Sequence, residues 1–320
     1  AQRSMVTVFV AMLFAACSRD QPAPSGDSTR APSRQPQATN SAPGAPPASP
    51  TPTGAGTVIA LGDIASCDSS GDEQTAALVA TLRGTILTLG DTAYESGTAD
   101  EFRECFEPAW GPLKSRILPV PGNHEYRTEG ASGYFEYFGR LAGPPDHKGW
   151  YATDIGEWRI YSLNSNCNHA GGCGPGSRQY EWLKSDLAAN PRACVLAYWH
   201  HPKFTQGPHA DDEGGSGAAF WPLLYSAGAD IVLNGHDHYY QRFAPQTPGG
   251  TADAVNGIRE FVVGTGGKNL THPNRSEPNV EATDDKHYGA LVLQLGDGGY
   301  SWMFIADGGT VIDNGSSDCH

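Results

Sequence analysis

Nine residues with side chains that can bind metal ions follow short apolar runs along the chain. They comprise carboxylates, histidines, an asparagine and a tyrosine: Asp63, Asp91, Tyr94, Asn123, His124, His200, His201, His236 and His238. Oxygen and imidazole donors suit iron, zinc, manganese or nickel better than calcium or a cysteine-bound structural zinc. This many donors exceed one tetrahedral site and are enough for two ions that share a carboxylate. Two ions roughly 3.5–4 Å apart can hold the attacking and leaving oxygens of a displacement at phosphorus.

The apolar runs before these residues predict the strands that position them. We expect strands at 57–61, 85–89, 117–120, 193–199 and 231–233, and each of them ends at one of the polar groups. Ligand sites of open α/β sheets lie at the carboxyl ends of the strands. The five loops can therefore converge on one site.

Helical patterns separate several of these strands. Residues 72–83 carry acids in their first turn, and residues 177–189 begin after Ser177, a suitable N-cap. Residues 151–164 have the pattern of a β-hairpin. Three further strands are expected in the last part of the chain, at 259–263, 291–295 and 301–305. Strands that alternate with helices predict an α/β fold in which helices cover a sheet.

Composition limits the class of protein. The chain has 320 residues, 35 acidic and 21 basic, and a net charge of −14, which disfavours nucleic acid as a partner. It also contains 7 Trp, 13 Tyr and 11 Phe, enough aromatic residues for a large core. Residues 57–320 fit one large domain, which we expect to be catalytic.

The first 56 residues differ from the rest of the chain. Residues 1–16 contain Arg3 followed by an apolar run, as in a signal peptide, and Cys17 follows small residues, as in a bacterial lipoprotein. A plain secretory peptide with a free Cys17 is the alternative. Residues 17–56 are rich in Pro, Ser and Ala and are expected to be a disordered tether.

Six further cysteines favour disulfides in an exported protein. They allow 15 connectivities, of which we prefer those with Cys67–Cys105 and Cys167–Cys173. Cys194 begins an apolar strand and could be either a disulfide partner or a buried free thiol.

Five ordered motifs around the polar residues resemble those of the calcineurin-like metallophosphoesterases. They are GD at 62–63, GDTAY at 90–94, GNHE at 122–125, YWHH at 198–201 and GHDH at 235–238. The tyrosine three residues after the second aspartate, Tyr94, is typical of the purple acid phosphatase branch. The resemblance extends from about residue 57 to residue 267.

This resemblance implies a fold and two metal ions. The fold is an αββα sandwich, in which two mixed sheets are flanked by helices. A ferric ion would be bound by Asp63, Asp91, Tyr94 and His238. A divalent ion of iron, zinc or manganese would be bound by Asp91, Asn123, His200 and His236, so that Asp91 bridges the two.

The resemblance also implies an activity, the hydrolysis of phosphate monoesters by attack of a metal-bound hydroxide on phosphorus. Asn123 and His124 would contact the phosphate, and His201 either lines the cleft or only packs beside it. The acid that protonates the leaving group is either His124 or His209, which lies nine residues after His200. Plant members have a second histidine after the latter, where this chain has Ala210.

Other functions remain compatible with the sequence. The same fold can carry a phosphodiesterase, a nucleotidase or an alkaline phosphatase that uses zinc or manganese. A surface lipoprotein without activity is a further alternative. We expect a small phosphate ester as the substrate, no nucleic-acid or protein partner, and membrane attachment only through a lipid on Cys17. The expected location is the periplasm, the outer membrane or the surface of a bacterium, or the medium.

Overall fold

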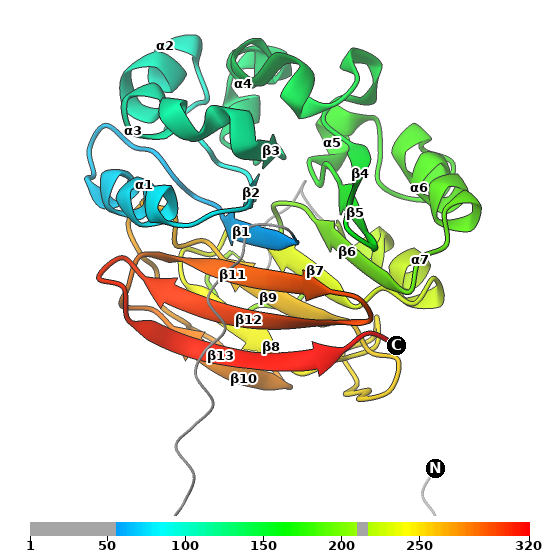
Figure 1. Cartoon of the computed structure of the whole chain (residues 1–320). Coiled ribbons are helices and arrows are strands. Elements are labelled where there is room, and N and C mark those ends of the chain that lie inside the picture. The colour runs from blue at the N-terminus through cyan, green and yellow to red at the C-terminus, as the bar shows by residue number, and fades with distance from the viewer. Residues whose placement is uncertain (1–55, 210–216) are drawn as a thin grey trace, which may run out of the picture. The chain divides into compact units, whose positions relative to one another are not determined.

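The apolar runs of the sequence form strands of two mixed β-sheets that pack face to face, with helices on their outer surfaces (Figure 1). The computed structural model describes residues 56–209 and 217–320. This arrangement confirms the expected αββα architecture with two mixed sheets. The predicted leader and tether lie outside the described residues, apart from Gly56.

The first sheet has six strands in the order β13-β12-β11-β1-β2-β3. Their bounds are β1 Thr57–Leu61, β2 Thr85–Thr88, β3 Ile117–Pro119, β11 Gly289–Gly296, β12 Gly299–Ala306 and β13 Val311–Asp318. Strands β1, β2 and β3 are parallel, so their carboxyl ends lie at one edge. Strand β11 pairs with β1 in the antiparallel direction, which makes the sheet mixed.

The second sheet has seven strands in the order β10-β8-β9-β7-β6-β5-β4. Their bounds are β4 Tyr151–Ile155, β5 Trp158–Ser162, β6 Cys194–Tyr198, β7 Ile231–Asn234, β8 Tyr240–Phe243, β9 Arg259–Val263 and β10 Val280–Asp284. Strands β5, β6, β7 and β9 are parallel, and the other pairings are antiparallel.

The central strands β6 and β7 of the second sheet are buried on both faces, which explains their continuous apolar runs, whereas the edge strands β4 and β10 are partly exposed. Along β6, Leu196 and Tyr198 pack in the core that also contains β1 and β11, whereas Val195 and Ala197 pack in a second core. That second core includes apolar residues of helices α6 and α7. The alternation therefore places one core between the sheets and another under the helices.

The helices are short apart from two. Their bounds are α1 Gly71–Thr81, α2 Ala99–Glu101, α3 Glu107–Trp110, α4 Ser132–Phe138, α5 Cys167–Ala170, α6 Arg178–Ala189 and α7 Trp221–Ser226. Helices α1 and α6 correspond to the two predicted helices, and Ser177 caps α6 by accepting a hydrogen bond from the Tyr180 amide. Within the described ranges, no helix is long and apolar enough to span a membrane.

Three disulfides crosslink the domain. Cys67–Cys105 and Cys167–Cys173 confirm the preferred pairs. Cys194 pairs with Cys319, which decides the open question in favour of a disulfide. The third bond connects the start of β6 in one sheet to the residue after β13 in the other.

Candidate metal centre

The predicted ligands come from the carboxyl ends of five strands in both sheets. Asp63, Asp91 and Asn123 follow β1, β2 and β3 of the first sheet. His200 follows β6 of the second sheet, and the GHDH motif follows β7. The two sheets thus contribute to one site, as the positions of the motifs predicted.

Three of these predicted ligands have a left-handed backbone conformation, which residues other than glycine rarely adopt. The φ angles of Asp63, Asp91 and His236 are 59°, 49° and 73°. Residues with a side chain occupy this left-handed region at a cost, and such residues concentrate at functional sites.

Glycines before the ligands allow the strand ends to approach one another. A Cβ atom at Gly90 would lie 2.6 Å from Nδ1 of His200, and one at Gly122 would overlap the Asp91 carboxylate. The glycine of the GD and GN motifs is therefore required for close contact between loops.

The first group of donors surrounds the hydroxyl of Tyr94. This oxygen lies 2.9 Å from Oδ1 of Asp63, 3.1 Å from Oδ2 of Asp91 and 3.3 Å from Nε2 of His238. Nδ1 of His238 lies 2.8 Å from the carbonyl of Asn269, which can only accept a hydrogen bond. Nδ1 therefore carries a proton, so Nε2 is the nitrogen that can bind a metal ion.

The second group of donors surrounds Nε2 of His200. This atom lies 3.0 Å from Oδ1 of Asn123, 3.2 Å from Nδ1 of His236 and 3.3 Å from Oδ2 of Asp91. Nδ1 of His200 lies 2.8 Å from the carbonyl of Leu89, so this nitrogen carries the ring proton. The same oxygen of Asp91 contacts both groups of donors, as a bridging carboxylate requires.

The donor set fits two cations. In the first group, a single hydroxyl proton serves three acceptors. In the second group, oxygens of Asn123 and Asp91 and a nitrogen of His236 converge on Nε2 of His200. Burial lowers the pKa of His200, but Asp91, Asp63 and the Leu89 carbonyl together raise it to about 9. Burial raises the pKa of Asp91, yet His200 and His124 bring it well below its usual value. The site therefore attracts positive charge, and its oxygen and imidazole donors are those of a metal centre.

Glu125 holds the loops of the first sheet together. It is fully buried and accepts hydrogen bonds from the amides of Gly122, Asp91 and Thr92, at 2.6, 3.0 and 2.7 Å. Burial and the neighbouring Asp91 carboxylate raise the pKa of Glu125 to about 7. The GNHE motif contains this residue, but the sequence alone assigned it no role.

His124 and His209 lie beside the ligands. The ring of His124 packs 4.3 Å from that of Tyr94, and its Nε2 lies 3.8 Å from Oδ2 of Asp91. The ring of His209 lies 5.1 Å from that of His236, although nearly thirty residues separate them. The structure therefore brings both candidate acids to the centre.

His201 is buried rather than open to solvent. Its ring lies 4.9 Å from that of His200 and 4.5 Å from that of His236. Burial and these two imidazoles hold the pKa of His201 well below its usual value, so the ring is neutral. The sequence left open whether His201 lines the cleft or only packs beside it. In the structure the His201 ring packs inside the domain and also lies against the rings of His200 and His236.

A charged cluster at the rim was not predicted. Nζ of Lys268 lies 4.7 Å from the centre of the Tyr94 ring and forms an ion pair with Glu95. Arg127 lies 3.7 Å from the same carboxylate. Glu101 adds a second carboxylate, which accepts a hydrogen bond from the Glu95 amide at 2.6 Å, so this cluster beside Tyr94 contains two cations and two anions. No motif marks Lys268 in the sequence.

The sequence matches the family described as calcineurin-like phosphoesterase over residues 56–240. Purple acid phosphatase 15 of Arabidopsis thaliana is 30% identical over 202 residues, which cover 57% of this chain and 36% of that protein. Human acid phosphatase type 7 is 30% identical over 165 residues, 46% of this chain and 36% of that protein. The chain thus spans about a third of the length of these relatives.

Solved structures share the fold. Purple acid phosphatase PPD1 from yellow lupin seeds superposes with a TM-score of 0.68 at 20% identity, over 82% of this chain and 53% of that chain. GAP50, the anchor in the inner membrane complex of Plasmodium, superposes with a TM-score of 0.61 at 14% identity, over 82% of this chain and 89% of that chain. The ligand geometry, the sequence match over more than half of the chain and the shared fold lead to one conclusion: this chain belongs to the calcineurin-like phosphoesterase family, and its relatives include purple acid phosphatases.

Proposed function

We propose that the protein is a phosphatase of the purple acid phosphatase type, which hydrolyses phosphate monoesters with a ferric and a divalent ion. The observation that carries the proposal is the position of the Tyr94 hydroxyl, within 3.3 Å of Asp63, Asp91 and His238. A phenolate is a hard anionic donor, which suits Fe(III).

The residues would divide between the ions as the two groups of donors do. Tyr94 and His238 would bind the ferric ion with Asp63, and His200, His236 and Asn123 would bind the divalent ion. Asp91 would bridge them. When bound, two such ions supply positive charge for the phosphate ester and a nucleophile below the pH at which free water provides one.

The protein would contribute the proton for the leaving group. Nδ1 of His124 lies 2.7 Å from the carbonyl of Glu95 and donates to it, so Nε2 is directed to the side of Asp91. A protonated His124 can donate from Nε2 to the departing oxygen. His209 is the alternative donor, and its amide is fixed by Oδ1 of Asp237 at 3.2 Å.

We also propose that the protein is exported. Three disulfides in one domain are typical of an oxidising compartment. Lipidation of Cys17 and a location in the bacterial envelope remain part of this proposal. Mass spectrometry of the mature N-terminus tests them, and a terminus other than Cys17 would contradict the lipid anchor.

The decisive experiment compares an aryl phosphate monoester with its diester from about pH 4 to 9, a range that spans imidazole and metal-water ionisation. We expect the monoester to dominate at acid pH. Asp91→Asn should abolish turnover and metal retention, whereas Asp307→Asn, at an exposed turn, should change neither. Preference for the diester, or an alkaline optimum, would favour the zinc or manganese phosphodiesterase. No turnover by the metal-loaded protein would favour a binding module.

A further inference from the structure

Three imidazoles lie together in the second group of donors, although only two were expected to bind metal. One nitrogen from each of His200, His201 and His236 lies within 4.8 Å of the others. Proximity alone would allow His201 to be a further ligand of the divalent ion. Its hydrogen bonds decide which of its nitrogens has a lone pair.

Ser165 is the partner that fixes the His201 ring. Its hydroxyl is fully buried, lies 2.8 Å from Nδ1 of His201, and accepts a hydrogen bond from the His201 amide at 3.2 Å. Among the residues that the structure describes, the hydroxyl proton has no other acceptor than Nδ1. The hydroxyl therefore donates to Nδ1, and the proton of the neutral ring lies on Nε2.

This tautomer is the opposite of that found in the neighbouring ligands. His200 and His238 donate from Nδ1 to main-chain carbonyls, which leaves the lone pair of Nε2 for a metal ion. In His201 the hydroxyl of Ser165 occupies the lone pair of Nδ1, so the N–H group is at Nε2, in a ring whose centre lies 4.9 and 4.5 Å from those of His200 and His236. An N–H group cannot bind a cation, but it can donate to a phosphate oxygen.

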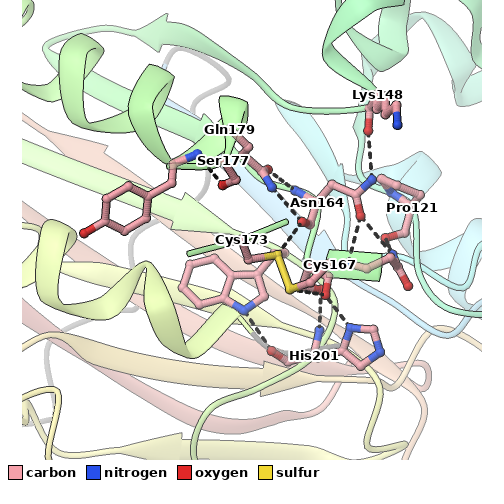
Figure 2. Close-up of a disulfide and its surroundings, with 12 residues drawn as sticks. Pro121, Lys148, Asn164, Cys167, Cys173, Ser177, Gln179 and His201 are labelled. Carbon is pink, nitrogen blue, oxygen red and sulfur yellow. Dashed lines mark hydrogen bonds between the residues drawn. A yellow bond between two sulfur atoms is a disulfide. The ribbon is translucent and has the colours of Figure 1, made fainter. Parts of the chain in front are cut away.

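The turn that carries Ser165 is held from several sides. The disulfide Cys167–Cys173 closes it two residues later (Figure 2). Asn166 donates to the carbonyl of Pro121, which precedes the GNHE motif, at 3.1 Å. Gln179 of α6 bonds both the amide and the carbonyl of Asn164, at 2.7 and 2.9 Å (Figure 2). The turn thus connects the GNHE loop, the His201 loop and α6.

We infer that Ser165 is a positioning residue that fixes His201 as the Nε2–H tautomer, so that His201 donates a hydrogen bond to the bound phosphate group and does not bind the metal. The Cys167–Cys173 disulfide keeps Ser165 in place for this task. The inference rests on the proposed function because it assigns a contact to a phosphate that this function requires.

Nitrogen-15 NMR of the dizinc-loaded protein tests the tautomer without any turnover. The wild type should show His201 protonated on Nε2, and Ser165→Ala should lose this preference. Ser165→Thr, which retains the hydroxyl, should restore it. Ser162→Ala is the matched control, since this buried serine of β5 bonds the carbonyl of Gly149 and not His201. A wild-type ring protonated on Nδ1 would overturn the inference.

Binding of inorganic phosphate to the same dizinc protein tests whether His201 donates a hydrogen bond to the phosphate. We expect Ser165→Ala to bind phosphate about tenfold more weakly, which is the effect of losing one hydrogen bond to a charged group. The variant should still retain two zinc ions. The double variant Cys167→Ala/Cys173→Ala should weaken phosphate binding in the same way, whereas Cys194→Ala/Cys319→Ala should not. Unchanged phosphate affinity in Ser165→Ala would overturn the inference. A diester preference of the wild type would contradict the proposed function and leave the tautomer result intact.

Discussion

The hydroxyl of Tyr94 occupies a position in which its environment opposes ionisation. Burial and the carboxylates of Asp63 and Asp91 raise the pKa of this phenol well above its usual value. Only a strongly charged cation between these groups can convert the phenol into a phenolate ligand. The iron-loaded wild type should therefore be coloured by charge transfer from phenolate to Fe(III).

Tyr94→Phe should abolish this absorption band while the domain remains folded, because only one buried oxygen is removed. Tyr126→Phe is the control: this tyrosine lies near the centre and its hydroxyl accepts a hydrogen bond from Asn164 at 2.7 Å. Visible spectra and circular dichroism of both iron-loaded variants provide the measurement. Persistence of the band in Tyr94→Phe would show that another residue binds the ferric ion.

The sequence predicted the residues of the centre that belong to motifs, because each motif has a fixed position after a strand. It did not predict Ser165 or Lys268, which reach the centre from loops without such a pattern. Their roles depend on tertiary contacts, namely the hydrogen bond to His201 and the approach to the Tyr94 ring. The role of Glu125 could not be predicted from the sequence either, because it depends on hydrogen bonds from the Asp91 and Thr92 amides of a different loop.

At the scale of elements, strand β9 supports the loop that follows His201. Glu260 of β9 is fully buried and accepts hydrogen bonds from the amides of Lys203 and Phe204, at 3.0 and 3.3 Å. Burial raises the pKa of Glu260 to about 8, against the effect of these amides. The folded protein thus binds this proton more tightly than the unfolded chain does.

This difference in proton binding makes the free energy of unfolding depend on pH. Stability from the Glu260 proton is fully present below the unfolded pKa of about 4.5 and is lost as the pH rises through about 8. Since one pKa unit corresponds to about 1.4 kcal/mol, and most of the loss spans the three pH units from 5 to 8, Glu260→Gln should gain roughly 4 kcal/mol relative to the wild type between pH 5 and pH 9. Urea unfolding of both proteins at the two pH values measures this gain. Parallel losses in both would contradict a protonated Glu260.

Elements with a strong apolar pattern were predicted well, and polar or short ones were not. Strands β1, β6 and β7 are continuous buried runs, which the sequence displays directly. Strand β13 has the sequence VIDNGSSD and is largely exposed, so its place at the sheet edge depends on pairing with β12. The helical segment from α2 to α3 also lacked a clear signal, because its turns are short and irregular.

At the scale of the whole domain, the Cys194–Cys319 disulfide joins the two sheets across 125 residues of sequence. Because it restricts the unfolded chain, closing so long a loop should stabilise the fold by about 5 kcal/mol. Cys194→Ala/Cys319→Ala should therefore unfold at lower denaturant concentration with unchanged kcat. Cys194 lies at the start of β6 and the ligand His200 follows its end, so the bond is remote from the centre. A loss of kcat equal to that of a ligand variant would contradict this separation.

The metal ions would be a second crosslink between the sheets, and this one would be reversible. Asp63, Asp91 and Asn123 come from the first sheet, whereas His200 and His236 come from the second. An ion that binds only the folded state adds about 4 kcal/mol at a concentration one thousand times its Kd. Chelation should therefore lower the Tm of the wild type by several degrees. Asp91→Asn should begin with a low Tm that chelation no longer changes, because it lacks the bridging carboxylate. A wild-type Tm that does not respond to chelation would mean that the two sheets are held by their apolar core and the disulfide alone.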